Sequence, residues 1–161
     1  MNAKVADSLN TQLREELFSS YLYLSMAAYF ENEGLRGFAH WMEQQAKEEL
    51  EHAMKIYRFI ADRGARIKLL DIEQPKHEWK SPLDAFEDAL KHEQYITSRI
   101  NTLMTVAREE GDYATEIFLQ WFITEQVEEE ANVGEIVDRL RMVQNSPNGL
   151  FMVDRELAMR K

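Results

Sequence analysis

The chain contains no cysteine, and glycine and proline account for only 6 and 3 of its 161 residues. The absence of cysteine excludes disulfides, thiolate metal sites and thiol nucleophiles. The scarcity of glycine and proline favours long regular elements with few breaks. No stretch approaches the roughly 18 to 20 consecutive apolar residues that cross a bilayer, and the amphipathic N-terminal segment lacks the apolar core of a signal peptide. We therefore expect a cytoplasmic protein with no membrane partner.

The composition is that of a folded, acidic protein. Hydrophobic residues make up 45% of the chain and charged residues 30%, with a formal net charge of -10. This length suits one domain over residues 1–161 with a full hydrophobic core. An acidic surface repels nucleic acid and attracts cations, so no nucleic-acid partner is expected. The same charge also serves solubility, and composition alone favours that plainer interpretation.

Apolar residues recur at alternating steps of four and three along four long segments, the pattern of amphipathic helices. Gly34 and Gly64 are expected to end the first two helices, and Ser81 and Pro82 to begin the third as N-cap and first helical residue. A short fifth helix follows "NSPNG". The expected helices span about residues 5–32, 37–63, 82–110, 113–144 and 149–159.

The connection between the second and third helices is unusually long. A helix of 28 residues is about 42 Å long, and an extended connection of about 18 residues reaches about 59 Å. The connection can therefore run the whole length of the bundle and leave the second and third helices parallel. The expected fold is all-α, a four-helix bundle with one long crossover and a short fifth helix at the C-terminal end.

Each long helix carries a polar interruption of its apolar stripe. The spacing is the same in both halves of the chain. In each half, 33 positions separate the inward polar residue of the first helix from that of the second, and the second helix carries a further polar residue three positions later. The residues are Glu16, Glu49 with His52, Glu93, and Gln126 with Glu129. The second half of the chain thus repeats the positions of the first at an offset of 77.

The spacing has a geometric meaning. Residues equidistant from the turn of an antiparallel hairpin lie at the same height, and both 33-residue intervals are centred on a predicted turn. Three-residue steps add a ligand on the same helix face. All these side chains therefore converge near the middle of the bundle, on the face that also carries Leu50, Ala53 and Ile56 as expected core residues.

Four carboxylates gathered in a core repel one another unless they are protonated or neutralised. Divalent cations are the natural neutraliser, and oxygen ligands with one imidazole suit iron. Taken singly, Glu49-x-x-His52 is also common on solvated faces, and a tyrosine on the core face, such as Tyr23, more often serves packing than chemistry. A metal-free interaction bundle would need lysine or arginine to pair the carboxylates, and the inward stripes contain none.

The chain resembles the non-haem ferritins of bacteria and archaea over essentially its whole length. The resemblance rests on REELFSSYLYLSMA, FAHWMEQQAKEELEHAMK, KHEQYITSRI, FLQWFITEQVEEE and GLFMVDREL. It implies a ferritin-like fold and a ferroxidase that oxidises Fe(II) with oxygen or peroxide. It also implies iron storage and detoxification, with the ferric mineral held inside a homo-oligomeric cage of 24 subunits.

The resemblance also implies roles for individual residues. Glu16, Glu49 and His52 match the first iron site of the family, and Glu49 bridges to a second site with Glu93 and Glu129. Gln126 matches a glutamine near the centre rather than a firm ligand. A third iron site, on the path to the cavity, is matched by Glu48, Glu125, Glu128 and Glu129. Tyr23 matches a tyrosine beside the centre, and Trp121 is the nearest other aromatic residue.

Differences from related families argue against three other kinds of ferritin-like protein. Bacterioferritins place a haem-ligating methionine where this chain has Leu50, and a second Glu-x-x-His where it has Gln126-x-x-Glu129, so no haem is expected. The absence of cysteine excludes the iron domain of rubrerythrins. The small DNA-binding starvation cages lack a fifth helix and place iron between subunits.

Two questions stay open at the level of sequence. A monomeric or dimeric di-iron enzyme acting on an organic substrate is the alternative to a storage cage, although bulky inward residues leave it little room for a substrate. Asp112 and Glu116 lie where the family has acidic channels for iron uptake, but surface acidity explains them equally well.

Overall fold

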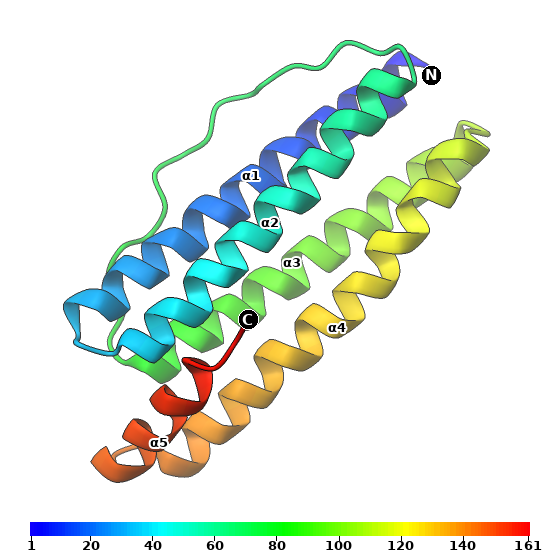
Figure 1. Ribbon diagram of the computed structural model, residues 1–161. Helices are drawn as coiled ribbons and strands as arrows, with labels where there is room; N and C mark the ends of the chain where they lie inside the picture. The colour runs from blue at the N-terminus through cyan, green and yellow to red at the C-terminus, as the bar shows by residue number, and fades with distance from the viewer.

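The computed structural model describes residues 1–161 as five helices and no strand. Four long helices form a bundle. Those joined by a short turn are antiparallel, the second and third helices are parallel, and the short fifth helix lies across one end (Figure 1). The predicted all-α bundle with one long crossover is confirmed, with bounds within two residues of those expected. The helices are α1 (Ala3–Asn32), α2 (Arg36–Asp62), α3 (Pro82–Glu109), α4 (Tyr113–Val143) and α5 (Pro147–Leu157).

Local signals set the ends of these helices. The Ser81 side chain accepts a hydrogen bond from the backbone N–H of Asp84, and Pro82 begins α3. Gly34 and Gly64 follow α1 and α2 with φ of 74° and 70°, a left-handed conformation that other residues rarely adopt. The fifth helix starts two residues earlier than expected, because Ser146 caps it by accepting from the N–H of Gly149.

The long crossover runs alongside α1 from one end of the bundle to the other (Figure 1). The buried amide of Asn10 fixes its first part: Nδ2 donates to the carbonyl of Arg66 at 2.9 Å, and Oδ1 accepts from the N–H of Lys68 at 2.7 Å. Further along, the Ser25 hydroxyl donates to the carbonyl of Lys76. The crossover therefore lets α2 and α3 run parallel, as the length of the connection predicted.

The core is divided into two apolar clusters. One gathers around Phe30, Phe38 and Phe86, near the end covered by α5. The other gathers around Leu9, Ile56 and Ile100 toward the opposite end. Neither cluster includes the inward polar residues, which form a buried layer of their own: Glu16, Gln45, Glu49, His52, Glu93, Gln126 and Glu129.

One expected core residue is on the surface. Leu50 is 46% exposed, whereas its neighbour Glu49 is 1% exposed. Adjacent residues of a helix point about 100° apart, so turning Glu49 fully inward turns Leu50 away from the core. No helix of the bundle is long and apolar enough to span a membrane.

The fifth helix sits close against the start of α2. A Cβ atom added at Gly37 would lie 1.7 Å from the backbone oxygen of Asp154. The Asp154 carboxylate also accepts a hydrogen bond from the N–H of Phe38 at 3.0 Å. Only glycine permits this approach, so Gly37 positions α5 on the bundle.

Candidate metal centre

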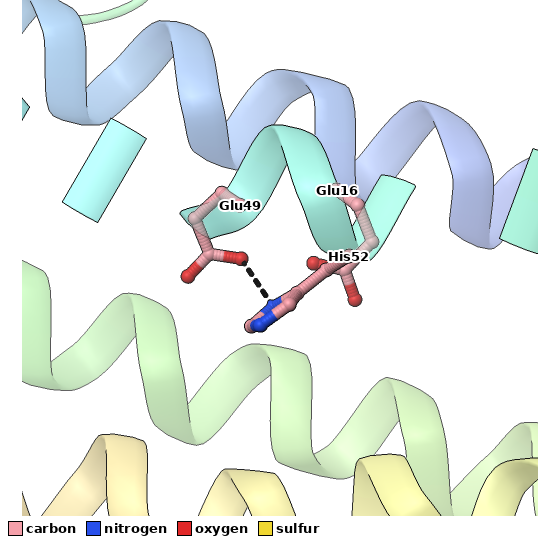
Figure 2. A group of neighbouring side chains, drawn as sticks. All are labelled: Glu16, Glu49 and His52. Carbon is pink, nitrogen blue, oxygen red and sulfur yellow. Dashed lines mark hydrogen bonds and ion pairs between the residues drawn. The ribbon is translucent and has the colours of Figure 1, made fainter. Parts of the chain in front are cut away.

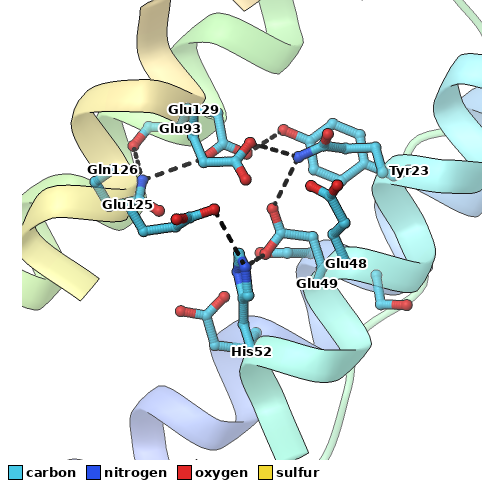
Figure 3. Close-up of polar contacts among 12 residues, drawn as sticks. Tyr23, Glu48, Glu49, His52, Glu93, Glu125, Gln126 and Glu129 are labelled. Atoms are coloured by element: carbon cyan, nitrogen blue, oxygen red, sulfur yellow. Dashed lines mark hydrogen bonds and ion pairs between the residues drawn. The ribbon is translucent and has the colours of Figure 1, made fainter. Parts of the chain in front are cut away.

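The middle of the bundle holds three overlapping groups of potential metal ligands. In each group one ligand atom per residue lies within 4.8 Å of the others. All four long helices contribute at least one side chain (Figure 3). The groups are Glu16, Glu49 and His52; Glu49, Glu93 and Glu129; and His52, Glu125 and Glu129.

The first group joins α1 and α2. His52 lies one turn after Glu49, and its Nδ1 is 3.1 Å from Oε2 of Glu49. The carboxylate of Glu16 approaches the same space from α1 (Figure 2). All three residues are buried, so the set offers two carboxylates and one imidazole to a single cation.

The second group shares Glu49 with the first. Glu93 of α3 and Glu129 of α4 approach Glu49 from the other hairpin, and all three are buried. One carboxylate has two oxygens and can therefore serve two adjacent cations. The geometry thus places Glu49 where a bridging ligand of a metal pair would lie.

The third group lies toward a hollow of about 390 Å³ between α2, α4 and α5. Glu125 approaches His52 Nε2 at 3.8 Å and belongs to the group, as does Glu129. Glu48 and Glu128, also expected at a third site, line the same hollow but fall outside the group. The structure therefore brings the four expected carboxylates to one hollow, and two of them, Glu125 and Glu129, belong to the third ligand group.

Burial without a cation shifts the pKa values of these groups. Desolvation raises the pKa of Glu16 to about 7 and that of Glu129 to about 8. Desolvation and the neighbouring carboxylates together raise the pKa of Glu49 well above its usual value, and burial also raises that of Glu93. Burial lowers the pKa of His52 to about 4, which keeps its imidazole neutral and able to bind a metal.

The donor set fits a divalent cation. The buried residues include no lysine or arginine, so no side chain supplies the missing positive charge. Oε2 of Glu16 is buried and has no hydrogen-bond partner. A buried carboxylate in this state is costly, and hard or borderline cations such as iron bind carboxylate and imidazole ligands.

Glutamines orient the carboxylates. Gln12 donates to Glu16 at 3.1 Å, and Gln126 donates to Oε2 of Glu93 at 3.1 Å. Gln45 donates to Glu129 at 2.7 Å and to Glu49 at 3.2 Å. The sequence analysis missed the role of Gln12, although its position four residues before Glu16 repeats that of Gln45 before Glu49 and could have revealed it.

Two aromatic residues border the centre. Tyr23 is fully buried, and its hydroxyl donates to Oε1 of Glu93 (Figure 3). Burial and the nearby carboxylates raise the pKa of Tyr23 well above its usual value, so the phenol is neutral. The ring of Trp121 lies 5.3 Å from that of His52, with the Lys55 ammonium 4.0 Å above the indole. Tyr23 thus touches the ligand set directly, whereas Trp121 borders its imidazole.

Asp112 and Glu116 lie apart from this centre. Asp112 caps α4 by accepting from the N–H of Thr115, and it pairs with Arg63 at 2.9 Å. Glu116 pairs with Arg108 at 2.7 Å. Each carboxylate therefore has a local structural partner, and neither belongs to the ligand groups.

A buried carboxylate–histidine cluster inside a four-helix bundle defines a class of metal-binding helical proteins. A family model for the ferritin-like domain matches residues 6–143. The chain therefore belongs to the ferritin-like family, and its relatives place it among the non-haem ferritins.

Relatives known from sequence and from solved structures are ferritins. A bacterial non-heme ferritin of Staphylococcus aureus (strain MRSA252) is 40% identical over 160 residues, which cover 99% of this chain and 96% of that protein. One of Staphylococcus saprophyticus is 41% identical over the same shares of each chain. The structure of an open-pore ferritin from the archaeon Archaeoglobus fulgidus superposes with a TM-score of 0.99 at 47% identity, covering 100% of this chain and 99% of that one.

Proposed function

We propose that this protein stores and detoxifies iron by oxidising Fe(II) at the intrasubunit centre and holding the ferric product in a hollow cage of identical subunits. The observation that carries the proposal is that Glu49 belongs to two ligand groups at once. The first group, Glu16, Glu49 and His52, would hold one Fe(II), and Glu49, Glu93 and Glu129 would hold the second. Oxygen or peroxide would accept the electrons.

The chemistry of the ligands favours this reaction. Carboxylates stabilise Fe(III) more than Fe(II), because their charge interacts more strongly with the higher charge of the product. The glutamines and Tyr23 hold the carboxylate oxygens toward the iron positions. Binding of Fe(II) replaces the protons that the raised pKa values retain on Glu16 and Glu129, so those protons are released when iron binds.

The hollow beside the centre would receive the product. Glu48, Glu125, Glu128 and Glu129 line it and supply a third iron site through which oxidised iron leaves the pair of positions. Only 3 of the 11 residues that line the hollow are hydrophobic. A charged hollow suits a cation rather than an organic substrate, which favours storage over a di-iron enzyme of organic chemistry.

The exposed surface of the single subunit favours assembly into a cage. Large apolar side chains are exposed on the outward side of several elements, a feature of subunit interfaces. They include Tyr21, Leu24, Leu69, Tyr113 and Phe151. We propose a shell of 24 copies, formed by the whole chain acting as one ferritin-like domain.

Aerobic addition of excess Fe(II) to the metal-free protein, followed by size exclusion with iron analysis, tests the proposal. We expect oxidised iron to elute with a particle many times the 19.0 kDa mass of one chain. Glu49→Ala should slow oxidation at least about tenfold, whereas Glu51→Ala, which changes an exposed carboxylate of the same helix, should not. Iron that precipitates away from a small protein still binding a few ions would instead favour the di-iron enzyme.

A further inference from the structure

An arginine occupies the hollow where the third iron site is proposed. Arg160 follows α5, and its Nη2 lies 3.1 Å from Oε2 of Glu48. Glu48 is one of the four carboxylates assigned above to that site. The ion pair therefore places a fixed cation of the protein on a carboxylate that a metal ion would need.

Several contacts on α2 hold Arg160 in this position. Its Nη1 donates to the carbonyl of Trp41 at 3.1 Å, and its guanidinium lies 4.4 Å from the centre of the Trp41 ring. The Nε2 of His40 donates to the Arg160 carbonyl. The side chain is only 19% exposed, so the guanidinium is a built part of the hollow rather than a loose surface charge.

The other arginine of the hollow is differently engaged. Arg139 pairs with Glu135 at 2.8 Å and with Glu156 at 2.6 Å, and neither is assigned to the third site. Arg160 is therefore the one cation lining the hollow that is paired with a third-site carboxylate. The two arginines carry the same charge near the same hollow but bind different carboxylates.

A guanidinium and a metal ion compete for the same carboxylate oxygen. When Glu48 is paired with Arg160, the metal loses a ligand and meets a like charge nearby. A metal at the site would need Glu48 to turn toward it, which would open the ion pair. Because Glu48 is 45% exposed on its side chain, it has room to make this change.

We propose that Arg160 is an intramolecular competitor cation that weakens the third site and speeds the departure of oxidised iron toward the cavity. The inference rests on the proposed function, because it requires the third site. Arg160 acts through Glu48 and is a positioning residue. A third site of low affinity would release its ion toward the cavity, whereas a site of high affinity would stay occupied and block further transfer.

The test is Tb³⁺ titration of the metal-free protein, followed by the luminescence that Trp41 and Trp121 sensitise. Tb³⁺ is an oxygen-binding ion with no redox reaction here, so affinity is measured apart from oxidation. Arg160→Gln should tighten the third Tb³⁺ by about threefold to fivefold, the range of a partly exposed ion pair. Arg139→Gln removes the same charge from the same hollow and should change it by less than about twofold. Arg160→Lys, which keeps the charge, should restore most of the weak binding.

Other outcomes overturn the proposal in distinguishable ways. An unchanged or weaker third site in Arg160→Gln, with three ions still bound by the unaltered protein, overturns the role of Arg160 alone. Equal tightening by Arg139→Gln would assign the effect to net charge and overturn it too. If the unaltered protein and Glu128→Gln bind only the same two ions, the third site is absent and the role of Arg160 falls, whereas the paired iron positions of the proposed function stand. A crystal structure with Zn²⁺ in the hollow should show Glu48 separated from Arg160, and persistence of the ion pair there would contradict the competition.

Discussion

The hydroxyl of Tyr23 on α1 donates a hydrogen bond to Oε1 of Glu93 on α3, and both side chains are shut off from solvent. This contact is a direct polar link between the two hairpins at the candidate metal centre. It fixes the carboxylate that only the second ligand group contains. Losing such an orienting partner typically weakens metal binding or activity by 10-fold to 100-fold, as an order of magnitude.

Tyr23→Phe should therefore slow Fe(II) oxidation by at least about tenfold, measured by stopped-flow absorbance of the ferric product. The ring still fills its space, so the melting temperature should change little. Tyr29→Phe is the matched control, because Tyr29 is buried on the same helix against Phe30 and Trp79, away from the centre. Equal rates in Tyr23→Phe and the unaltered protein would show that Glu93 needs no support from the phenol.

Gln45→Leu should weaken the centre through two carboxylates at once. The amide of Gln45 donates to both Glu129 and Glu49, and leucine has similar volume but no donor. We expect Zn²⁺ affinity, measured by calorimetry, to fall by about tenfold or more. Gln44→Leu, one position along the helix on a less buried face, should leave the affinity within about twofold. A similar loss in both variants would point to altered helix packing instead.

The metal-free protein should lose stability as the pH rises from about 6.5 to 8. Glu16 and Glu129, with pKa values of about 7 and 8, keep protons in the folded state that the unfolded chain has already released. Because the folded state binds more protons, the free energy of unfolding falls with rising pH. His52 and His92, with pKa values lowered to about 4 by burial, bind fewer protons in the folded state than in the unfolded chain, so they raise the free energy of unfolding as the pH rises to about 6.5 and add no slope above it.

Scanning calorimetry of the metal-free protein should show the melting temperature falling by several degrees across this window, about 2–4 °C per kcal/mol. Added Zn²⁺ should reverse the fall, because metal replaces the protons on the carboxylates. Glu129→Gln should flatten the slope. A melting temperature that rises from pH 6.5 to 8 without metal would mean that the carboxylates are ionised in the fold.

Gly37→Ala should displace α5. The added methyl group would overlap the backbone of Asp154, and backbone cannot move aside as a flexible side chain can. Overpacking of this kind costs about 1–3 kcal/mol, which corresponds to a melting temperature lower by about 2–12 °C. Metal binding at the centre, which lies on the four long helices, should persist.

Gly134→Ala is the control, and we expect it to raise the stability that Gly37→Ala lowers. Gly134 lies inside α4, and nothing is within 4 Å of its added Cβ. Alanine should therefore raise stability by up to about 1 kcal/mol through helix propensity. A destabilised Gly134→Ala, or a Gly37→Ala with unchanged melting, would contradict this account of the two glycines.

The sequence predicted the fold and the convergence of the inward polar side chains, because both depend on spacing. The 33-residue intervals and the three-residue steps specify which side chains meet, whatever the details of packing. Arg160 could not be placed in this way, because its contact with Glu48 depends on how α5 settles against α2, through Gly37. Leu50 was misplaced because a run of apolar letters leaves the rotation of a helix uncertain by one residue. Ion pairs and glutamine donors likewise depend on side-chain rotamers that periodicity does not encode.

Among the four long helices, α1 associates closely with α2 and α3 with α4, and across the bundle only α1 and α3 approach each other. The ligand groups nevertheless cross between the hairpins, since Glu49 meets Glu93 and Glu129. A bound cation would therefore tie together two halves that share few backbone approaches. The degree of metal loading would then set how readily each subunit opens along its length, so that iron reinforces the protein that carries it.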